Sequence, residues 1–267
     1  MGFFGHSFTF DDIPCEEFDL MCYDVGGENS GSGEFASVVT IQEETIASKW
    51  KPYFYGTTHD GKKLEFSMVF GVSQDRIDSG RYLDRYELNG IASWLTGHDA
   101  YKWLTIEQDD MSFVRYNCII TSLSIVEFGK IPWALQATVT CDSPYGYMSP
   151  QTFSYEINGT ANIQIENESC LNRYYMPIMD IYMNGGDFAI KNISDGGRRT
   201  AFTSVPASVS HIKVDNDNLV ITNDQEINLY PNFNFTFLRL KKGINALQVT
   251  GRGTLEITCE FPINTGG

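Results

Sequence analysis

The four histidines are the residues best suited to acid–base chemistry, and their spacing does not assemble a catalytic site. His6, His59, His98 and His211 lie far apart, each beside turn or polar residues. His98 and Asp99 could form a base with its orienting carboxylate, but adjacent side chains usually diverge. The sequence also lacks the G-x-S-x-G, H-E-x-x-H, P-loop and G-x-G-x-x-G patterns. We therefore assign no catalytic residue and predict a protein that is not an enzyme.

One enzymatic alternative stays open at this point. A glycosidase needs two carboxylates whose separation in space does not depend on their separation in sequence. Asp and Glu number 34, so such a pair could exist without leaving a motif.

The cysteines do not predict a metal site. They are Cys15, Cys22, Cys118, Cys141, Cys170 and Cys259. No two of them form a C-x-x-C pair, and no histidine stands at zinc spacing from them. Several occupy apolar positions of strand patterns, so we predict buried, reduced thiols and intracellular synthesis.

The segment "DNDNLVITNDQE", residues 215–226, has part of the spacing of a calcium loop. Asp215, Asp217 and Glu226 match the first, third and twelfth positions, but Val220 stands where the sharp turn requires glycine. Asp and Asn side chains hydrogen-bond their own backbone in turns, so a polar hairpin turn explains these residues better. We predict neither a metal nor a cofactor.

Aromatic side chains on a β-sheet face could instead stack on sugar rings. The candidates for such carbohydrate contacts are Tyr174, Tyr175, Tyr182, Phe188 and Tyr230. Aromatic residues at strand spacing also occur in cores and interfaces, and that alternative applies to each of the five.

The net charge of the chain limits the class of partner that it can be expected to bind. Across 267 residues there are 19 Lys and Arg against 34 Asp and Glu, a net charge of −15, and no Lys/Arg run exceeds two. Nucleic-acid affinity comes mainly from clustered cations, so sequence-specific nucleic-acid binding is not expected.

The opening "MGFFGHSFTFDDIP" lacks the basic and apolar regions of a signal peptide, and no apolar run approaches the roughly 18 residues that would span a bilayer. We expect no membrane insertion.

Alternating apolar residues predict a chain made mainly of β-strands. The clearest runs are "KLEFSMVFGV", "IPWALQATVTCD" and "TLEITCEF", in which every second side chain is apolar. One helix is predicted near 84–96, where apolar residues recur at helical spacing between a possible N-cap, Asp84, and a stop at Gly97. These elements must position any functional surface.

A boundary between two domains is predicted at "CDSPYGYMSP", where two prolines and a glycine follow a strong strand. The first domain is then residues 1–142, the linker 143–150 and the second domain 151–267. In the second domain, "NFNFTFLRLKKGINALQVTG", residues 232–251, predicts a core hairpin. Its Phe233, Phe235 and Phe237 share a face, and its loop is Lys241-Lys242-Gly243.

The order of these parts resembles the distal tail proteins, or baseplate hubs, of long-tailed phages with non-contractile tails. The resemblance rests on "FTFDDIPCEEFDLMCYDV", "ELNGIASWLTG", "AYKWLTIEQDDMSFVRYNCIITSLSI" and "GKIPWALQATVTCDSPYGY" in the first domain. In the second it rests on "NRYYMPIMDIYMNG" and "NFNFTFLRLKKGINALQVTG". It covers most of the chain.

The resemblance implies a structural virion protein without catalytic residues, made in the host cytoplasm and placed at the distal end of the tail. The N-terminal domain would be a tail-tube-like β-sandwich or barrel with one helix, forming a ring of typically six subunits. The C-terminal domain would be a galectin-like or carbohydrate-module-like β-sandwich. The implied partners are the tail tube protein, the tape-measure protein and the tail-tip protein, and the acidic charge suits a channel through which DNA slides.

Two segments are candidates for intersubunit arms, because backbone hydrogen bonds can continue across sheet edges and hairpins. One is the Gly-rich segment that contains Gly26, Gly27, Gly31 and Gly33, and the other is the hairpin near Gly129. Plain surface loops are the alternative for both. A carbohydrate-binding module that uses the C-terminal domain is the alternative function.

Overall fold

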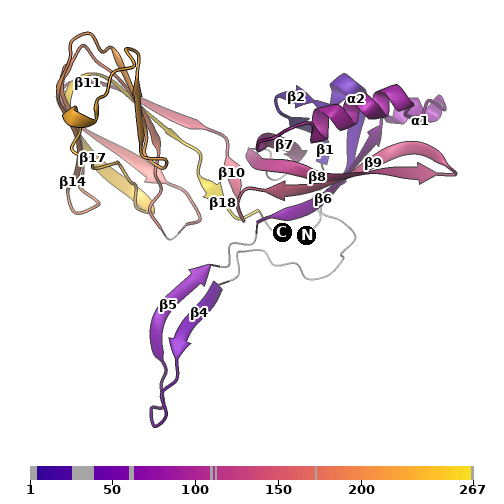
Figure 1. Cartoon of the computed structure of the whole chain (residues 1–267), viewed down its shortest axis with the longest axis horizontal. Helices are drawn as coiled ribbons and strands as arrows, with labels where there is room; N and C mark the ends of the chain where they lie inside the picture. The colour runs from indigo at the N-terminus through magenta and orange to yellow at the C-terminus, as the bar shows by residue number, and fades with distance from the viewer. Residues whose placement is uncertain are drawn as a thin grey trace. The chain divides into compact units, whose positions relative to one another are not determined.

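The computed structural model describes residues 5–25, 39–59, 63–108, 111, 113–171 and 173–265. The chain forms two compact units, Met1–Tyr147 with Asn264–Gly267, and Met148–Ile263. Both are built mainly of antiparallel strands (Figure 1). The prediction of a mainly β, two-domain protein is therefore confirmed.

The first unit is organised by one antiparallel sheet with strand order β2-β1-β7-β8-β9-β6-β3. Its strands are β1 (Gly5–Phe10), β2 (Ile13–Pro14), β3 (Leu20–Val25), β6 (Glu65–Val72), β7 (Lys102–Gln108), β8 (Val114–Phe128) and β9 (Ile131–Cys141). A short strand, β10 (Gly146–Met148), also pairs with β8, and a 3-10 turn, η1 (Cys15–Phe18), follows β2. Strands β4 (Val39–Glu44) and β5 (Tyr53–His59) pair only with each other.

The sheet follows the predicted alternation closely in β6. Leu64, just before the strand, and Phe66, Met68, Phe70 and Val72 are all buried. In β9 the apolar face is buried only from Leu135 onward, because Ile131 lies at the exposed end of the β8–β9 hairpin.

The predicted helix is confirmed as α2 (Arg85–Thr96), which lies across one face of the sheet (Figure 1). Asp84 caps it by accepting hydrogen bonds of 2.8 Å from the backbone nitrogens of Tyr86 and Glu87. Trp94 fixes the helix to the sheet: its Nε1 donates to the Phe10 carbonyl at 3.1 Å, and its ring stacks on Phe8. A second, shorter helix, α1 (Gln74–Asp78), was not predicted.

The second unit contains a sheet of order β14-β13-β17-β12-β15-β16, with β11 paired to β17. Its strands are β11 (Gln151–Asn167), β12 (Ile178–Tyr182), β13 (Gly186–Asn192), β14 (Arg198–Val205), β15 (His211–Asp215), β16 (Val220–Asn223) and β17 (Gly243–Cys259). The two-residue strand β18 (Pro262–Ile263) is not part of this sheet. β17 pairs with β13 through Leu247–Thr250 and with β12 through Thr254–Thr258. β17 therefore joins β13 and β14 on one side to β12, β15 and β16 on the other. The buried residues of this unit form one apolar core.

The predicted hairpin over residues 232–251 is wrong. β17 begins at Gly243 and pairs along its whole length with β11, whereas residues 233–242 contain only isolated bridges, Tyr175 with Leu240 and Phe202 with Phe233. Phe235 has a positive φ of 55° and is 67% exposed, so it does not share a buried face with Phe233. The physical reason is that β11, whose residues lie 76 to 108 positions earlier than their partners, forms the hydrogen bonds of β17 in place of its sequence neighbour.

Candidate functional site

The hairpin of β4 and β5 carries a set of uncovered aromatic side chains. The two strands pair from Val39 with His59 to Glu44 with Tyr53, with a bulge at Tyr55 beside Gly56, whose φ is 135°. The exposed apolar side chains of the hairpin are Ile41, Ile46, Trp50, Tyr53, Phe54 and Tyr55. We call this segment, residues 39–59, the aromatic arm.

Contacts within the aromatic arm hold its shape without covering its aromatic rings. Tyr55 Oη donates to Glu44 Oε2 at 2.9 Å, and Lys49 Nζ contacts both the hydroxyl and the ring of Tyr53. Trp50 is nevertheless 94% exposed and Phe54 is 64% exposed. Burying a side chain the size of Phe contributes about 1.5–3 kcal/mol, so covering these rings would add several such contributions to an interface.

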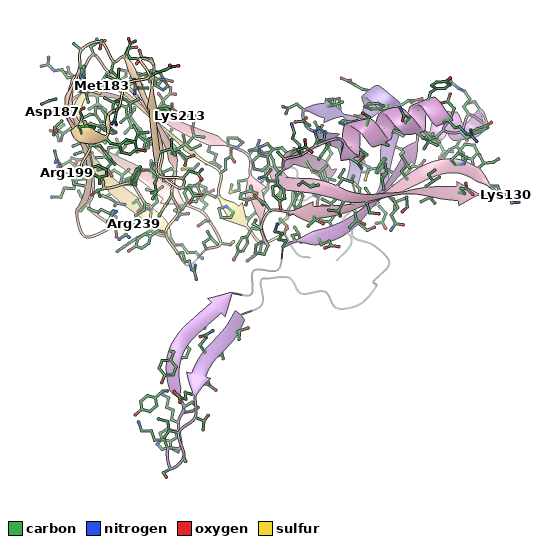
Figure 2. The ribbon with its side chains drawn as sticks, viewed as in Figure 1. Lys130, Met183, Asp187, Arg199, Lys213 and Arg239 are labelled. Atoms are coloured by element: carbon green, nitrogen blue, oxygen red, sulfur yellow. The ribbon has the colours of Figure 1, made fainter. Side chains whose placement is uncertain are left out.

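The tip of the β8–β9 hairpin is a second exposed apolar surface. Gly129 and Lys130 form its two-residue turn with φ of 63° and 68°, which is the geometry that matches the twist of paired strands. Ile125, Val126 and Ile131 beside the turn are exposed. Figure 2 shows Lys130 at the far end of this hairpin. The predicted arm near Gly129 therefore carries exposed apolar side chains.

The other predicted arm, with Gly26, Gly27, Gly31 and Gly33, lies outside the described residues. The aromatic arm itself was missed from sequence. Its available signal was the alternation in "VTIQEE" and the dense aromatic run "KWKPYFYG". Because aromatic residues fall on both faces of the second run, the period-2 pattern did not identify it.

Three of the five carbohydrate candidates are occupied by structural contacts. Phe188 is buried in the core of the second unit. Tyr175 is partly buried against Phe261, and its hydroxyl accepts a 2.8 Å hydrogen bond from the backbone nitrogen of Glu260. Burial raises the pKa of Tyr175 well above its ordinary range. Tyr230 donates to the Leu219 carbonyl at 3.1 Å.

Tyr174 and Tyr182 remain exposed to similar extents, 39% and 42%. Tyr174 is engaged in a cluster: its hydroxyl donates to Asp195 Oδ1 at 3.1 Å, and the Arg239 guanidinium lies 3.7 Å from its ring centroid. Tyr182 stacks on His211 with ring centroids 4.6 Å apart and lies beside a pocket. The structure thus does not gather the five aromatics into one surface.

The histidines with described side chains serve local contacts. His98 approaches the Trp94 carbonyl at 2.6 Å and Asp11 at 3.9 Å, so its carboxylate neighbour is Asp11, whereas Asp99 was the residue considered from sequence. His211 pairs with Asp180 at 2.7 Å. Within the described ranges, no group of three His, Cys, Asp or Glu side chains could hold a metal ion.

The segment at 215–226 forms the predicted hairpin turn between β15 and β16. Asp215 Oδ1 accepts hydrogen bonds from the backbone nitrogens of Asp217 and Asn218 at 3.1 and 2.9 Å.

Five of the six cysteines are buried, as predicted, and all six are free thiols. None of the helices in the described part of the chain is both long and apolar enough to cross a membrane.

Two family models match consecutive parts of the sequence. Residues 3–143 match the model of a phage tail protein N-terminal domain, and residues 145–259 match that of a phage tail C-terminal domain. No curated protein sequence matches the chain.

Solved structures share the fold over most of the chain. The Dit protein of phage SPP1, described as a paradigm of the hub adsorption apparatus in phages that infect Gram-positive bacteria, superposes with a TM-score of 0.65 at 13% identity. That match covers 96% of this chain and 98% of the SPP1 chain. A chain of the phage P2 baseplate, activated with calcium, gives 0.51 at 10% identity and 90% coverage of both chains. A strontium form gives 0.50 at 12% identity, covering 97% and 98%.

Proposed function

Because the chain belongs to the phage tail protein family, to whose two domains its residues 3–143 and 145–259 correspond, we propose that it is the distal tail hub of a phage with a non-contractile tail. In this proposal the copies, six in number by the family resemblance, form a ring. The ring joins the tail tube to the tail-tip apparatus. It surrounds the tape-measure protein and then the passing DNA.

The observation that carries this proposal is the aromatic arm. A hairpin with Trp50 and Phe54 uncovered is unfavourable on an isolated protein in water, whereas it is well suited to lie against a neighbouring subunit. The apolar tip of the β8–β9 hairpin supports the same conclusion from a second element of the first unit. We therefore assign ring formation to the first domain, residues 1–142, and an outer position to residues 151–267, joined by the linker 143–150.

The net charge of −15 supports a channel role because like charge prevents DNA from adhering to the walls. The hub role itself requires no catalysis. We propose that the protein acts as a non-enzymatic structural component at the distal end of the virion tail.

Light scattering after size-exclusion chromatography tests the ring. We expect the full-length protein to form an assembly of about six 30.1 kDa chains at high concentration, with rings in negatively stained micrographs. A strict monomer with no rings at any concentration would overturn the proposed function.

Variants of the aromatic arm test the surface that closes the ring. Trp50→Ala combined with Phe54→Ala is expected to shift the assembly toward monomer, because both side chains lose contact area. Tyr86→Ala is the matched control, since Tyr86 on α2 is 90% exposed but lies outside the arm. If both variants lost assembly equally, or if neither did, the aromatic arm would not be part of the interface. Ring formation itself is tested separately, by the mass measurement on the unaltered protein.

A further inference from the structure

Positive charge gathers at one end of the second unit, although the chain as a whole has a net charge of −15. Six of the nine Lys and Arg residues of this unit lie on the β13–β14 hairpin or in the segment that leads into β17. They are Lys191, Arg198, Arg199, Arg239, Lys241 and Lys242, and we call them the cationic patch. Figure 2 shows Arg199 and Arg239 in the half of the unit away from Met183.

Hydrogen bonds hold the two segments of the cationic patch together. Arg198 Nε donates to the Phe237 carbonyl at 3.3 Å, and Asn192 Nδ2 donates to the Arg239 carbonyl at 2.9 Å. The two lysines of the second segment follow Arg239 closely in the sequence. The cations of both segments therefore share one end of the unit.

Most of these cations have no carboxylate partner. Lys191 and Arg199 stand directly opposite each other on β13 and β14, and like charges opposed across an antiparallel pair are destabilising. Lys241 and Lys242 are adjacent and exposed. Within the described ranges, none of these four side chains forms an ion pair. Their charge is therefore available to an external anion.

Arg239 adds a guanidinium that is held in one orientation. Its Nε donates to the buried Asp195 at 2.7 Å, and the group lies 3.7 Å from the Tyr174 ring centroid. Asp195 is fixed in turn by a 3.1 Å hydrogen bond from Tyr174 Oη. These contacts use Nε and Nη2 of Arg239, so Nη1 has no partner among the described residues. A guanidinium held in this way can donate to a carboxylate with little loss of rotamer freedom.

Two exposed isoleucines accompany the cations. Ile193 is 52% exposed and Ile244 is 63% exposed. Ser194 Oγ donates to the Ile244 carbonyl at 3.4 Å, which brings the backbones of the two segments close together. Glu166, opposite Ile244 on β11, is one carboxylate against the excess of positive charge. A ligand that fits this surface therefore combines anionic groups with apolar side chains.

These features favour an acidic protein segment over a nucleic acid. Single-stranded nucleic acids stack their bases on exposed aromatic rings, and in this patch Arg239 already covers one face of Tyr174. A long polyanion is also repelled by the rest of the acidic chain, whereas a short segment contacts the patch alone. We propose that the cationic patch binds a segment of another protein in which carboxylates alternate with apolar side chains. This binding goes beyond assembly of the ring and does not depend on it.

Fluorescence anisotropy on the full-length protein tests the site, with two labelled peptides as probes. One peptide repeats Glu-Glu-Leu and the other repeats Glu-Glu-Ser. We expect the leucine peptide to bind with a Kd below about 1 mM at about 50 mM salt, more weakly at high salt, and more tightly than the serine peptide. Lys241→Ser combined with Lys242→Ser is expected to weaken binding about fivefold. Ile244→Ser is expected to remove the preference for leucine.

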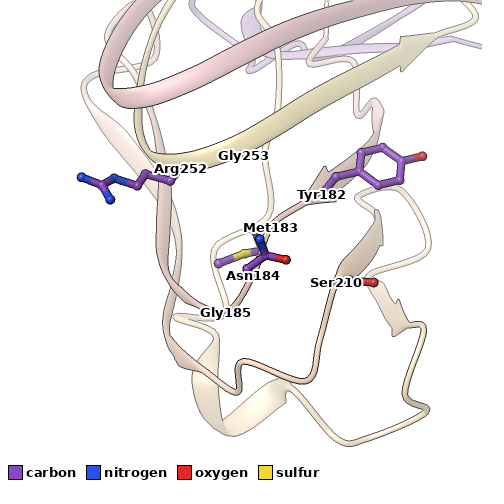
Figure 3. A pocket seen from close by; sticks show the side chains of 7 residues that line it. All are labelled: Tyr182, Met183, Asn184, Gly185, Ser210, Arg252 and Gly253. Atoms are coloured by element: carbon purple, nitrogen blue, oxygen red, sulfur yellow. The ribbon is translucent and has the colours of Figure 1, made fainter.

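Lys213→Ser combined with Arg252→Ser is the matched control. It removes the same charge from exposed positions of the same unit, outside the cationic patch. Figure 3 shows the Arg252 side chain extending outward, away from Tyr182 and Asn184. This variant is expected to keep its affinity for the leucine peptide.

Three results would each overturn the proposal. They are no binding of either peptide at about 1 mM protein, equal affinity for the two peptides, and equal loss of binding in the patch variant and the control variant. A single-stranded oligonucleotide that binds at least as tightly as the leucine peptide would also overturn it. Assembly mass is measured on the same samples, so a failure of peptide binding is distinguished from a failure of the ring.

Discussion

Asn192 Nδ2 donates a hydrogen bond of 3.1 Å to Asn245 Oδ1, and both side chains are buried. Asn245 also accepts from the backbone nitrogen of Lys241 at 2.9 Å and donates to the carbonyls of Lys241 and Gly243 at 2.7 and 2.9 Å. Asn192 donates further to the Arg239 carbonyl at 2.9 Å. This amide pair therefore joins β13 to the irregular segment that leads into β17.

Replacing Asn245 with Ala is expected to destabilise the second unit by about 2–3 kcal/mol. The change removes one of the two acceptors of the buried Asn192 Nδ2 and takes away the side-chain partner of the Lys241 backbone, and buried polar groups that lose their partners are costly. Urea unfolding followed by circular dichroism measures the loss, because the four tryptophans all lie in the first unit and do not report on the second. Asn158→Ala is the control: Asn158 is exposed, and its side chain has no partner among the described residues, so a change within about 0.5 kcal/mol is expected. Similar costs for both variants would contradict the role of the pair.

Arg76 and Glu87 form a corresponding polar link in the first unit. Arg76 Nη2 lies 3.0 Å from both carboxylate oxygens of Glu87, and it also donates to the Tyr82 carbonyl at 3.0 Å. Burial by itself would raise the pKa of Glu87. The hydrogen bonds from Arg76 and the Asp84 backbone, with the Arg76 charge, outweigh burial and hold that pKa below its ordinary value of 4.5.

The lowered pKa of Glu87 gives its contribution a defined pH dependence. A carboxylate with a depressed folded pKa stabilises the protein fully above its unfolded pKa, and the contribution is lost as pH falls through the folded pKa. We expect Glu87→Gln to reduce the free energy of unfolding by about 1–2 kcal/mol at neutral pH. The difference from the unaltered protein should shrink below about pH 4. Urea titrations between about pH 7 and pH 3 measure both effects.

Glu65→Gln is the control for this pH series. Glu65 is exposed at the start of β6, and within the described ranges its side chain has neither an ion pair nor a hydrogen bond. A stability difference for Glu87→Gln that stays constant across the pH series, or that equals the Glu65→Gln difference, would contradict the Arg76–Glu87 link.

Elements with regular periodicity could be predicted from the sequence because local pattern decides them. The alternation in β6 and the capping residue Asp84 before α2 placed both elements within one or two residues of their observed ends. The stretch after Tyr230 could not be predicted in this way. Its alternating phenylalanines imitate a strand, but Phe235 adopts a left-handed backbone, and the partner of β17 is β11, which lies far away in the sequence.

The surroundings of Tyr182 and the aromatic arm could not be predicted from local sequence either. Tyr182 was identified as an exposed aromatic, but Ser210 and Arg252 reach its neighbourhood only because β17 pairs with β12 and β12 pairs with β15. The aromatic arm escaped notice because its exposed residues occupy both faces of a short hairpin, and exposure on two faces leaves no amphipathic pattern.

The thiols provide a prediction about accessibility. Burial raises the pKa of Cys15 to about 11 and the pKa values of Cys22, Cys141 and Cys259 to about 12, and it raises the pKa of Cys118 further. Because the thiolate is the reactive form, these five should be inert in the folded protein near pH 8. Titration with Ellman's reagent is expected to detect at most one fast thiol, Cys170, and six after denaturation. Cys170→Ser should remove the fast phase, and a second fast thiol would contradict the burial of the five.

Gly253 tests whether the convergence of β12 and β17 depends on a missing side chain. Gly253→Ala is expected to destabilise the second unit by about 2–3 kcal/mol or more, because its Cβ would overlap the Tyr182 carbonyl oxygen in a backbone with φ of 139°. Gly159→Ala is the matched control. Gly159 also has a positive φ, 97°, but a Cβ there meets nothing within 4 Å, so only the backbone term of about 1 kcal/mol applies. Thermal and urea unfolding compare the two, and a Gly253→Ala cost no larger than that of Gly159→Ala would show that the strands do not depend on this close approach.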